Sequence, residues 1–383
     1  MKNAKIKCIL KVLLTAFLSL AALLLVLLAA SCIAGFMQID KNIEYQNNHL
    51  EYLENEYYSD SYIPCDEQKL ADFNIEEAFS KDVKINEIAV LGTHNSYQLL
   101  GTAPKRALMR TLQIISFGAV ENKAVFEMDT FTEQLENGVR NLEIDIETVD
   151  NEGSISFIVS HKPILDNVSS AYNFENALKE IAMWSDNNPG HLPIYLLIEP
   201  KSNVPSINNM QDFSVKYAQE FDKVLREVLG EKLLTPKQAM GEHESLEAMR
   251  DANDWPTLKE AAGKVIVLMH PCDITQDYIN TDTSIKTQAM FPALGFDSID
   301  KSYASFIIEN DPSSAVKNNK ITVEEKRLMV RTRADDYPDL SDERYGFAKN
   351  CGSHIITTDY PPRSVRKNDH IYSFNGYTAK LLK

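Results

Sequence analysis

The chain has 383 residues, 44% hydrophobic and 25% charged, which is long enough for one large globular domain or two ordinary ones. Bulk disorder is excluded, because the sequence has no low-complexity tract, internal repeat or long run of one charge sign. The formal net charge is −16, and the four lysines of the first 37 residues leave 35 basic against 55 acidic residues beyond them, a balance of −20. Such an acidic body excludes nonspecific nucleic-acid binding.

The N-terminal segment combines lysines with a long apolar run. No charged residue occurs from Val12 to Met37, and about 20 apolar residues suffice to cross a bilayer as a helix. The preceding lysines predict a cytoplasmic N-terminus, with everything after Met37 outside the cytoplasm. We expect residues 1–37 to be a signal anchor, with a transmembrane helix at about 12–35, which would place the rest of the chain at the extracytoplasmic face of the cell membrane.

Two other interpretations of this segment stay open. A cleaved signal peptide would release a secreted protein, although the apolar run is longer than such a peptide needs. The stretch Leu28 to Cys32 (LAASC) also resembles a lipoprotein processing site, where Cys32 would take the lipid. Beyond the leader, Cys65, Cys272 and Cys351 allow at most one disulfide and form no zinc pattern, so we interpret them as structural.

Residues 38–72 are rich in Asn, Glu, Tyr and Asp and predict a stalk, with a short helix around Ile43 to Tyr57. Residues 73–383 would then form the main domain. In it, short β-branched apolar runs predict eight strands, at Glu87 to Leu91, Asn141 to Ile146, Ile155 to Ser160, Ile194 to Ile198, Val265 to Met269, Ser305 to Ile308, Leu328 to Val330 and His354 to Ile356.

Amphipathic segments between these runs predict helices, at Phe131 to Asn137, Asn173 to Asp186, Ser214 to Leu229, Leu258 to Ala262 and Asp342 to Cys351. Strands alternating with helices indicate parallel βα units, and eight of them over about 300 residues suit a closed (β/α)8 barrel. The alternative α/β architecture is a doubly wound open sheet.

Polar side chains occur where four consecutive predicted strands end, which is where a (β/α)8 barrel builds its active site. Leu-Gly-Thr-His-Asn-Ser (91–96) follows the first strand, and Glu143 and Asp145 lie in the second. His161 follows the third, and Glu199 with Lys201 closes the fourth.

The carboxylates of this group predict a metal site. Glu143 and Asp145 are two residues apart, so both point to one face of their strand, which in a barrel can be the lumen. Two carboxylates on such a face are costly unless a cation pairs with them. With Asn95 and Glu199 they form an all-oxygen set that suits Ca²⁺ or Mg²⁺. The plain alternative is a pair of exposed carboxylates on an edge strand.

His94 and His161 are the candidate catalytic pair. A lone histidine at a strand end is more often a hydrogen-bonded loop residue, but these two follow neighbouring predicted barrel strands. Cleavage of a phosphodiester by an internal hydroxyl requires a proton acceptor and a proton donor near neutral pH, which two imidazoles can supply.

With these residues in place, the chain from about Ile85 to Pro362 resembles the X-box catalytic barrel of phosphoinositide-specific phospholipases C, in particular its calcium-dependent bacterial and fungal branch. The resemblance implies that His94 and His161 catalyse, that Asn95, Glu143, Asp145 and Glu199 hold calcium, and that Lys201 faces the substrate. It rests on the ordered phrases LGTHNSYQ (91–98), FTEQLENGVRNLEIDIE (131–147), HKPILD (161–166), LLIEPK (196–201), WPTLKEAAGKVIVLM (255–269), VRTRADD (330–336) and ITTDYPP (356–362).

The chain departs from its mammalian relatives at the fifth predicted strand. A lysine closes that strand in the relatives, whereas His270 stands near the mouth here. We expect Arg331 and Arg333 to alternate in facing, so that only one of them points inward and supplies the missing charge. Their plain interpretation is a surface ion pair with Asp335 or Asp336.

The resemblance implies cleavage of phosphatidylinositol-type lipids to diacylglycerol and a cyclic or acyclic inositol phosphate. Calcium would lower the pKa of the inositol 2-hydroxyl, and a carboxylate ligand or one histidine would take its proton. We expect His94 to stabilise phosphoryl charge and His161 to act as acid, a division that the sequence alone does not fix. The rival enzyme is a glycerophosphodiester phosphodiesterase, whose first motif reads His-Arg-Gly where this chain has Thr-His-Asn-Ser. The other rival is a barrel that binds lipid at the surface without catalysis.

Overall fold

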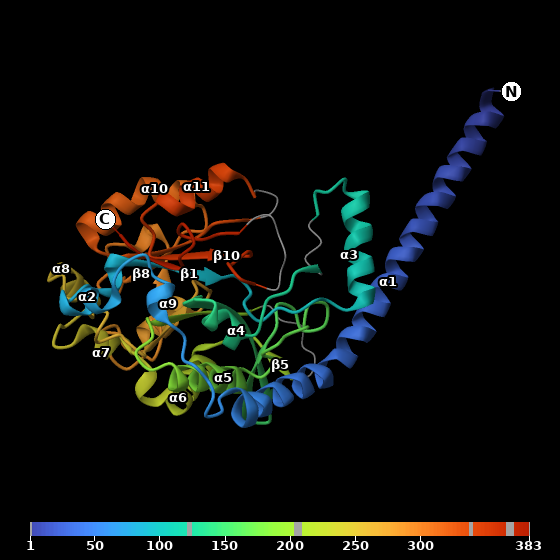
Figure 1. The fold of residues 1–383 in the computed structure, drawn as a ribbon. Helices are drawn as coiled ribbons and strands as arrows, with labels where there is room; N and C mark the ends of the chain where they lie inside the picture. Colours follow the sequence, from blue (N-terminus) through green and yellow to red (C-terminus); the bar gives the residue numbers. More distant parts are fainter. Residues whose placement is uncertain (1, 121–124, 203–208, 337–339, 365–370, 383) are drawn as a thin grey trace.

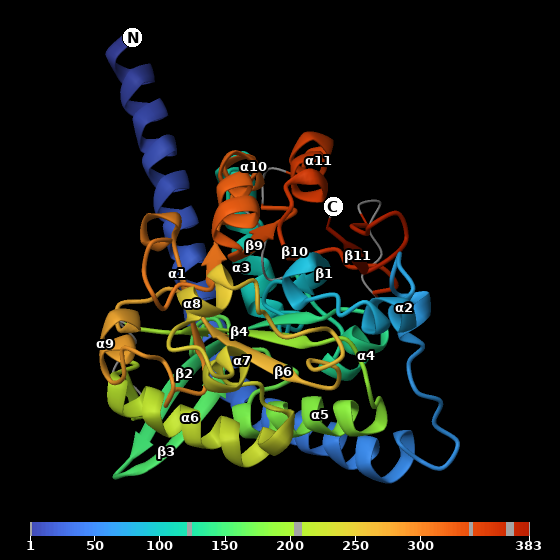
Figure 2. The same ribbon diagram turned by 90° about the vertical axis from the view of Figure 1, so that its left-hand side faces the viewer.

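A closed barrel of eight parallel strands forms the centre of the molecule, and helices surround it (Figure 1, Figure 2). The computed structural model describes residues 2–120, 125–202, 209–336, 340–364 and 371–382. Neighbouring strands pair in parallel around the whole ring, so the (β/α)8 prediction is confirmed and the open-sheet alternative is wrong. The barrel strands are β1 (Ile88–Thr93), β2 (Asn141–Asn151), β4 (Ile194–Pro200), β6 (Val265–Met269), β7 (Phe291–Leu294), β8 (Phe306–Ile308), β9 (Met329–Arg333) and β10 (Ile355–Thr358).

The barrel strands bury both faces, which is why they read as nearly continuous apolar runs. In β4, Tyr195 and Leu197 belong to the cluster that extends through the barrel interior. The alternate residues Ile194, Leu196 and Ile198 join the cluster between the barrel and its outer helices. This alternation turns the next inward position, Glu199, toward the barrel mouth.

Helices cover the outside of the barrel, and several begin at a side-chain cap. The Thr130 hydroxyl accepts a hydrogen bond from the Glu133 amide at the start of α4, and the Asn173 side chain caps α5 in the same way. The predicted helix at Leu258 to Ala262 is wrong, because that segment forms turns. The helices of the body are α2 (Ile75–Ser80), α3 (Ala103–Ile115), α4 (Phe131–Glu136), α5 (Phe174–Asn187), α6 (Val215–Leu229), α7 (Pro236–Met240), α8 (Leu246–Asp251), α9 (Thr275–Asn280), α10 (Pro312–Asn319) and α11 (Asp342–Asn350).

One predicted barrel strand lies outside the barrel, and one barrel strand was not predicted. The third predicted strand is β3 (Ser154–Val159), which pairs antiparallel with the outer half of β2. The eighth strand of the barrel is instead β7, which pairs in parallel with β6 and contains Pro292. Two further short strands pair antiparallel at the margins, β5 (Met210–Gln211) on β2 and β11 (Ala379–Leu381) on β1.

A single helix, α1 (Lys2–Tyr52), carries the apolar N-terminal run and projects from the body (Figure 1). It is the one helix of the described chain that is long and apolar enough to cross a membrane. The expected short helix at Ile43 to Tyr57 is the end of α1 and the π-helical turn Leu53–Tyr57 that continues it.

The C-terminal part of α1 lies against the barrel, although a stalk was expected there. Gln46 Nε2 donates to the Asn173 carbonyl oxygen over 2.9 Å, and His49 Nε2 lies 3.1 Å from Glu180 Oε1. The division of the chain at residues 37 and 72 stays a prediction, but residues of this segment are packed on the body.

Candidate active site

Three carboxylates meet at the carboxyl ends of β2 and β4. Parallel pairing sets Asp145 beside Glu199, and Glu143 lies one inward position earlier on β2. One oxygen from each of the three carboxylates lies within 4.8 Å of the others. Glu143 and Asp145 are buried, at 3% and 0% exposed. Their oxygens meet Glu199, and Glu143 pairs with Arg331 of the non-neighbouring strand β9, so both side chains point into the lumen, as expected.

Two cationic side chains compensate part of the negative charge of this cluster. The Arg331 guanidinium forms an ion pair with Glu143, and both side chains are buried. Lys201 Nζ lies 2.9 Å from Asp145 Oδ2 and 2.6 Å from Glu199 Oε1. Lys201, expected to face the substrate, therefore pairs with two of the candidate metal ligands in this structure.

The pKa values of Asp145 and Glu143 show that nearby positive charges offset the burial of these two carboxylates to different extents. Burial raises the pKa of Asp145 to about 7, and the nearby Glu199 charge acts in the same direction. Burial also acts to raise the pKa of Glu143, but Arg331 and His94 outweigh it, so that pKa is lowered. Asp145 is thus the carboxylate that would gain most from an additional cation.

The donor set fits a hard divalent cation such as calcium. All the donors are oxygens, and Asp145 Oδ1 is buried without a hydrogen-bond partner. Asn95 follows β1 at the same rim, 6% exposed, with a φ of 47° that asparagine tolerates better than most residues. Its neighbour Ser96 hydrogen-bonds the Glu143 backbone through both its amide and its hydroxyl, which holds Asn95 next to the cluster.

His94 lies at this rim between an aspartate and the cluster. Its Nδ1 is 3.1 Å from Asp359 Oδ1, and its Nε2 is 3.7 Å from Glu143 Oε1. Arg333 Nη2 also approaches Nδ1, at 3.5 Å. An Nδ1–H donated to Asp359 leaves Nε2 directed toward the carboxylates.

His161 reaches the same rim by a different route from the one expected. It follows β3, which returns antiparallel along β2 with Val159 opposite Ile146, so the chain beyond Val159 continues toward the rim that carries Asp145. The positive charge of His161 acts to lower the Asp145 pKa, which agrees with this closeness. Its Nδ1 lies 2.9 Å from Asp166 Oδ2, and Asp166 in turn forms an ion pair with Lys105.

The remaining expected residues also lie at the mouth, with one correction. His270 directly follows β6, the fourth barrel strand, and its charge lowers the pKa values of Glu143 and Glu199. The expectation that Arg331 and Arg333 face opposite ways is wrong. Residues two apart on a strand share a face, and Arg331 contacts Glu143 while Arg333 contacts His94. Arg333 also pairs with Asp336 at 3.4 Å, as its plain interpretation foresaw.

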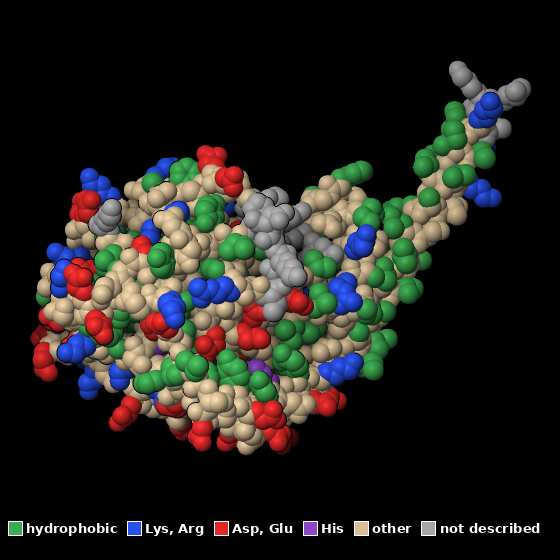
Figure 3. Space-filling view, in the orientation of Figure 1, with side chains coloured by type: hydrophobic (Ala, Val, Ile, Leu, Met, Phe, Trp, Pro, Cys, Tyr) green, Lys and Arg blue, Asp and Glu red, His purple; other side chains and the backbone are tan. Residues whose placement is uncertain are grey.

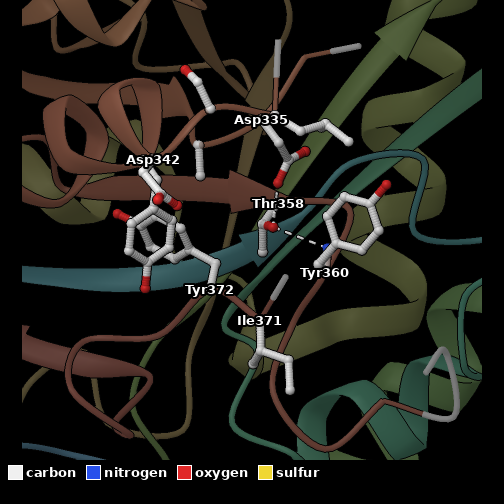
Figure 4. Close-up of a pocket in the computed structure, with 10 residues that line it drawn as sticks. Asp335, Asp342, Thr358, Tyr360, Ile371 and Tyr372 are labelled. Atoms are coloured by element: carbon white, nitrogen blue, oxygen red, sulfur yellow. Dashed lines mark hydrogen bonds between the residues drawn. The ribbon is translucent and has the colours of Figure 1, made fainter. Parts of the chain in front are cut away.

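A cavity of about 200 Å³ is lined in part by Thr358 and Tyr360, the chain neighbours of Asp359, which contacts His94. Figure 4 shows the Asp335 carboxylate in its wall, directed toward Thr358, whose hydroxyl donates to it. The amide of Asp359 also donates to Asp335, over 3.0 Å. Burial, with the Asp359 charge, raises the pKa of Asp335 to about 7. The cavity is lined by Ala334, Asp335, Leu340, Ser341, Asp342, Tyr345, Thr358, Tyr360, Ile371 and Tyr372.

Comparison with known proteins identifies one family. The family model for Ca²⁺-dependent phosphoinositide phospholipase C matches residues 83–158 and 154–381. No curated protein matches the chain.

Among solved structures, a calcium-dependent phosphoinositol-specific phospholipase C from a Pseudomonas species is 18% identical, with a TM-score of 0.54 over 82% of this chain and 99% of that chain. A Ca²⁺-dependent phosphatidylinositol-specific phospholipase C from Streptomyces antibioticus is 19% identical, with a TM-score of 0.51 over 72% of this chain and 95% of that chain. At these identities, the similarity to the solved structures establishes a shared barrel fold.

Proposed function

Because the chain belongs to the Ca²⁺-dependent phosphoinositide phospholipase C family, we propose that it is a membrane-anchored phosphodiesterase that cleaves phosphatidylinositol-type lipids. The products are diacylglycerol and a cyclic or acyclic inositol phosphate. One observation carries the proposal: three carboxylates within 4.8 Å of one another share a rim with two histidines, each hydrogen-bonded to its own aspartate.

Calcium is the cofactor of this family, and Asn95, Glu143, Asp145 and Glu199 would hold it here. When bound, the ion supplies positive charge for the phosphate oxygens and lowers the pKa of the attacking hydroxyl. A cationic centre is required, because the chain beyond the leader has a charge balance of −20 and would repel a phosphate ester.

His161 is assigned as the general acid. Its Nδ1 is engaged with Asp166, so Nε2 is the nitrogen that holds the transferable proton. As the inositol 2-hydroxyl oxygen bonds to phosphorus, the bond from phosphorus to the diacylglycerol oxygen breaks and His161 protonates that oxygen. The proton of the 2-hydroxyl passes to a carboxylate of the cluster.

His94 is assigned to the phosphoryl group. Its Nδ1–H donates to Asp359, which fixes the ring and leaves Nε2 to donate a hydrogen bond to a phosphoryl oxygen when the ring is protonated. Lys201, Arg333 and His270 are the candidate contacts for the phosphate and the inositol hydroxyls. Arg331 is excluded from that role, since its guanidinium is buried against Glu143.

The location of the enzyme follows from α1. Lysines precede its apolar run, so we assign the N-terminus to the cytoplasm and the barrel to the extracytoplasmic face of the cell membrane. A lipid substrate is present in that membrane, and tethering raises its effective concentration at the barrel mouth.

The test uses the full chain in mixed micelles of detergent and phosphatidylinositol. We expect the release of a water-soluble inositol phosphate that stops when calcium is chelated. His161→Ala should lower kcat by about 10²- to 10⁴-fold, the usual contribution of general acid catalysis. A variant that keeps full activity at saturating calcium would refute the acid assignment.

Two controls separate the rival functions. Hydrolysis of glycerophosphoinositol without cleavage of intact phosphatidylinositol would identify a glycerophosphodiester phosphodiesterase. Calcium binding without any product from a panel of phosphodiester lipids would identify a non-catalytic lipid-binding barrel.

A further inference from the structure

The helix α3 is basic, amphipathic and apolar at its end. Residues 103–115 include Lys105, Arg106 and Arg110 and no acidic residue, within a body that is otherwise strongly acidic. Its last turn and the residues after it expose large apolar side chains: Ile114 is 66% exposed and Phe117 is 98% exposed. Basic helices with an exposed apolar face are typical of membrane-surface helices.

This helix packs along α1 (Figure 1). The less exposed positions of the apolar run include Leu20, Leu24, Leu27 and Ser31, which lie on one helical face. The two helices run in opposite directions, so the C-terminal end of α3 points the same way as the N-terminus of α1 (Figure 1). The exposed end of α3 therefore extends along the part of α1 that is expected to cross the membrane.

The contacts of α1 with the barrel indicate where the bilayer surface lies. Counting about 20 residues from Val12 puts the outer edge of the hydrocarbon near Ser31. Four residues later, the Gly35 carbonyl oxygen accepts a hydrogen bond from Asn167 Nδ2 over 2.9 Å. The Asn42 side chain donates to the Asn167 carbonyl oxygen at 2.5 Å. The barrel thus begins just outside the bilayer, while the contact face of α1 at Leu20 to Ser31 is inside it.

The distribution of charge agrees with this placement. Figure 3 shows blue basic side chains where α1 and α3 meet the body and green apolar side chains along α1. The part of the body farther from α1 carries both red acidic and blue basic side chains. A body with a balance of −20 requires such a basic rim to approach an anionic lipid surface.

We propose that α3 is embedded beside α1 in the outer leaflet of a phospholipid bilayer, with Ile114, Ile115 and Phe117 in the hydrocarbon and Arg106 and Arg110 at the headgroups. The inference rests on the membrane anchoring in the proposed function. It assigns to the barrel a second lipid contact besides α1.

The embedded helix is connected to the site through its first turn. Lys105 of α3 is 7% exposed and forms an ion pair with Asp166, the hydrogen-bond partner of His161. Asn167, next to Asp166, is held by Gly35 and Asn42 of α1. The loop that carries His161 is therefore fixed between the two helices that contact lipid.

The test measures tryptophan quenching in the full chain, reconstituted into phosphatidylcholine vesicles containing brominated lipid. The native residues Trp184 and Trp255 are 0% and 1% exposed, so lipid quenchers should leave their emission nearly unchanged. F117W adds a reporter at the end of α3, and I114W adds a second in case the first variant does not fold. L13W in α1 is the positive control, and I63W, placed beyond the C-terminal end of α1, is the negative control.

We expect brominated lipid to quench most of the added emission in F117W, I114W and L13W and little of it in I63W. Quenching of L13W alone would overturn the inference, because α1 would then cross the bilayer without α3 beside it in lipid. Absence of quenching in all four variants would overturn it as well. The readout does not depend on catalysis, so quenching in a protein that cleaves no lipid would refute only the proposed activity.

Discussion

Replacing Glu143 by glutamine should affect both stability and calcium binding. The side chain keeps its shape but loses its charge, which leaves the buried Arg331 guanidinium without its ion-pair partner. Breaking a buried ion pair from one side typically costs about 3–5 kcal/mol. Arg331 keeps two other partners, because the negative charge of Glu199 acts on it and its guanidinium donates a hydrogen bond to Asn310 Oδ1. We therefore expect a loss of stability at the lower end of that range, about 3 kcal/mol.

The assay is thermal unfolding of the full chain in detergent, followed by circular dichroism with and without calcium. In chelator, E143Q should melt on the order of 10 °C below the wild type, given about 2–4 °C per kcal/mol for large domains. Calcium should raise the wild-type Tm by mass action and raise that of E143Q much less, because a candidate ligand is gone.

A matched variant isolates the ion pair. R331M alone should also destabilise the protein in chelator, since Glu143 then loses its guanidinium partner. The double variant E143Q/R331M should lose less stability than the sum of the two single variants. The reasoning would be refuted if E143Q melted with the wild type in chelator and kept the full calcium-induced shift.

Three further outcomes are expected. Burial lowers the pKa of His354 to about 4, below its unfolded value of about 6.5, so stability is lost as the pH falls through that window. The free energy of unfolding should fall by about 3 kcal/mol between pH 7 and pH 4 on account of this group. Urea unfolding at the two pH values should show a smaller fall in H354N than in the wild type. Gly35→Ala places a methyl group against the Ile164 carbonyl oxygen, and the variant should be about 1–3 kcal/mol less stable by the same urea titration. Lys105→Met removes the ion-pair partner of Asp166, so kcat should fall with little change in KM, and the alkaline limb of the pH–rate profile, where the general acid loses its proton, should shift. An unchanged profile would show that Lys105 does not position the acid.

The barrel could be predicted because its strands and helices alternate clearly in hydrophobic pattern. The third predicted strand failed for a physical reason: β3 is apolar like a barrel strand, but the two-residue turn Glu152-Gly153 folds it back as the antiparallel partner of β2. The strand β7 was missed because its four residues include Pro292, which usually argues against a central strand. The count of eight was therefore right with one wrong member.

The carboxylate cluster could be predicted more fully than the partners of the histidines. The spacing of Glu143 and Asp145 fixes their common face, which the structure confirms. Asp166 and Asp359 lie within phrases that carried the family resemblance, yet a single sequence does not show which aspartate reaches which histidine. The His161–Asp166 contact depends on the antiparallel pairing of β3 with β2, and the His94–Asp359 contact depends on the pairing of β10 with β1 that closes the barrel.

The continuity of α1 has a consequence for where the enzyme can work. One helix of 51 residues runs from the N-terminal lysines to the barrel. Its hydrogen bonds at Asn42, Gln46 and His49 restrict the movement of the barrel relative to the helix. With the proposed anchoring by α1, the barrel would be held at one height and would meet its substrate by lateral diffusion within a single leaflet. Lipids of an apposing cell would stay out of reach, and the barrel would act on the membrane that anchors it.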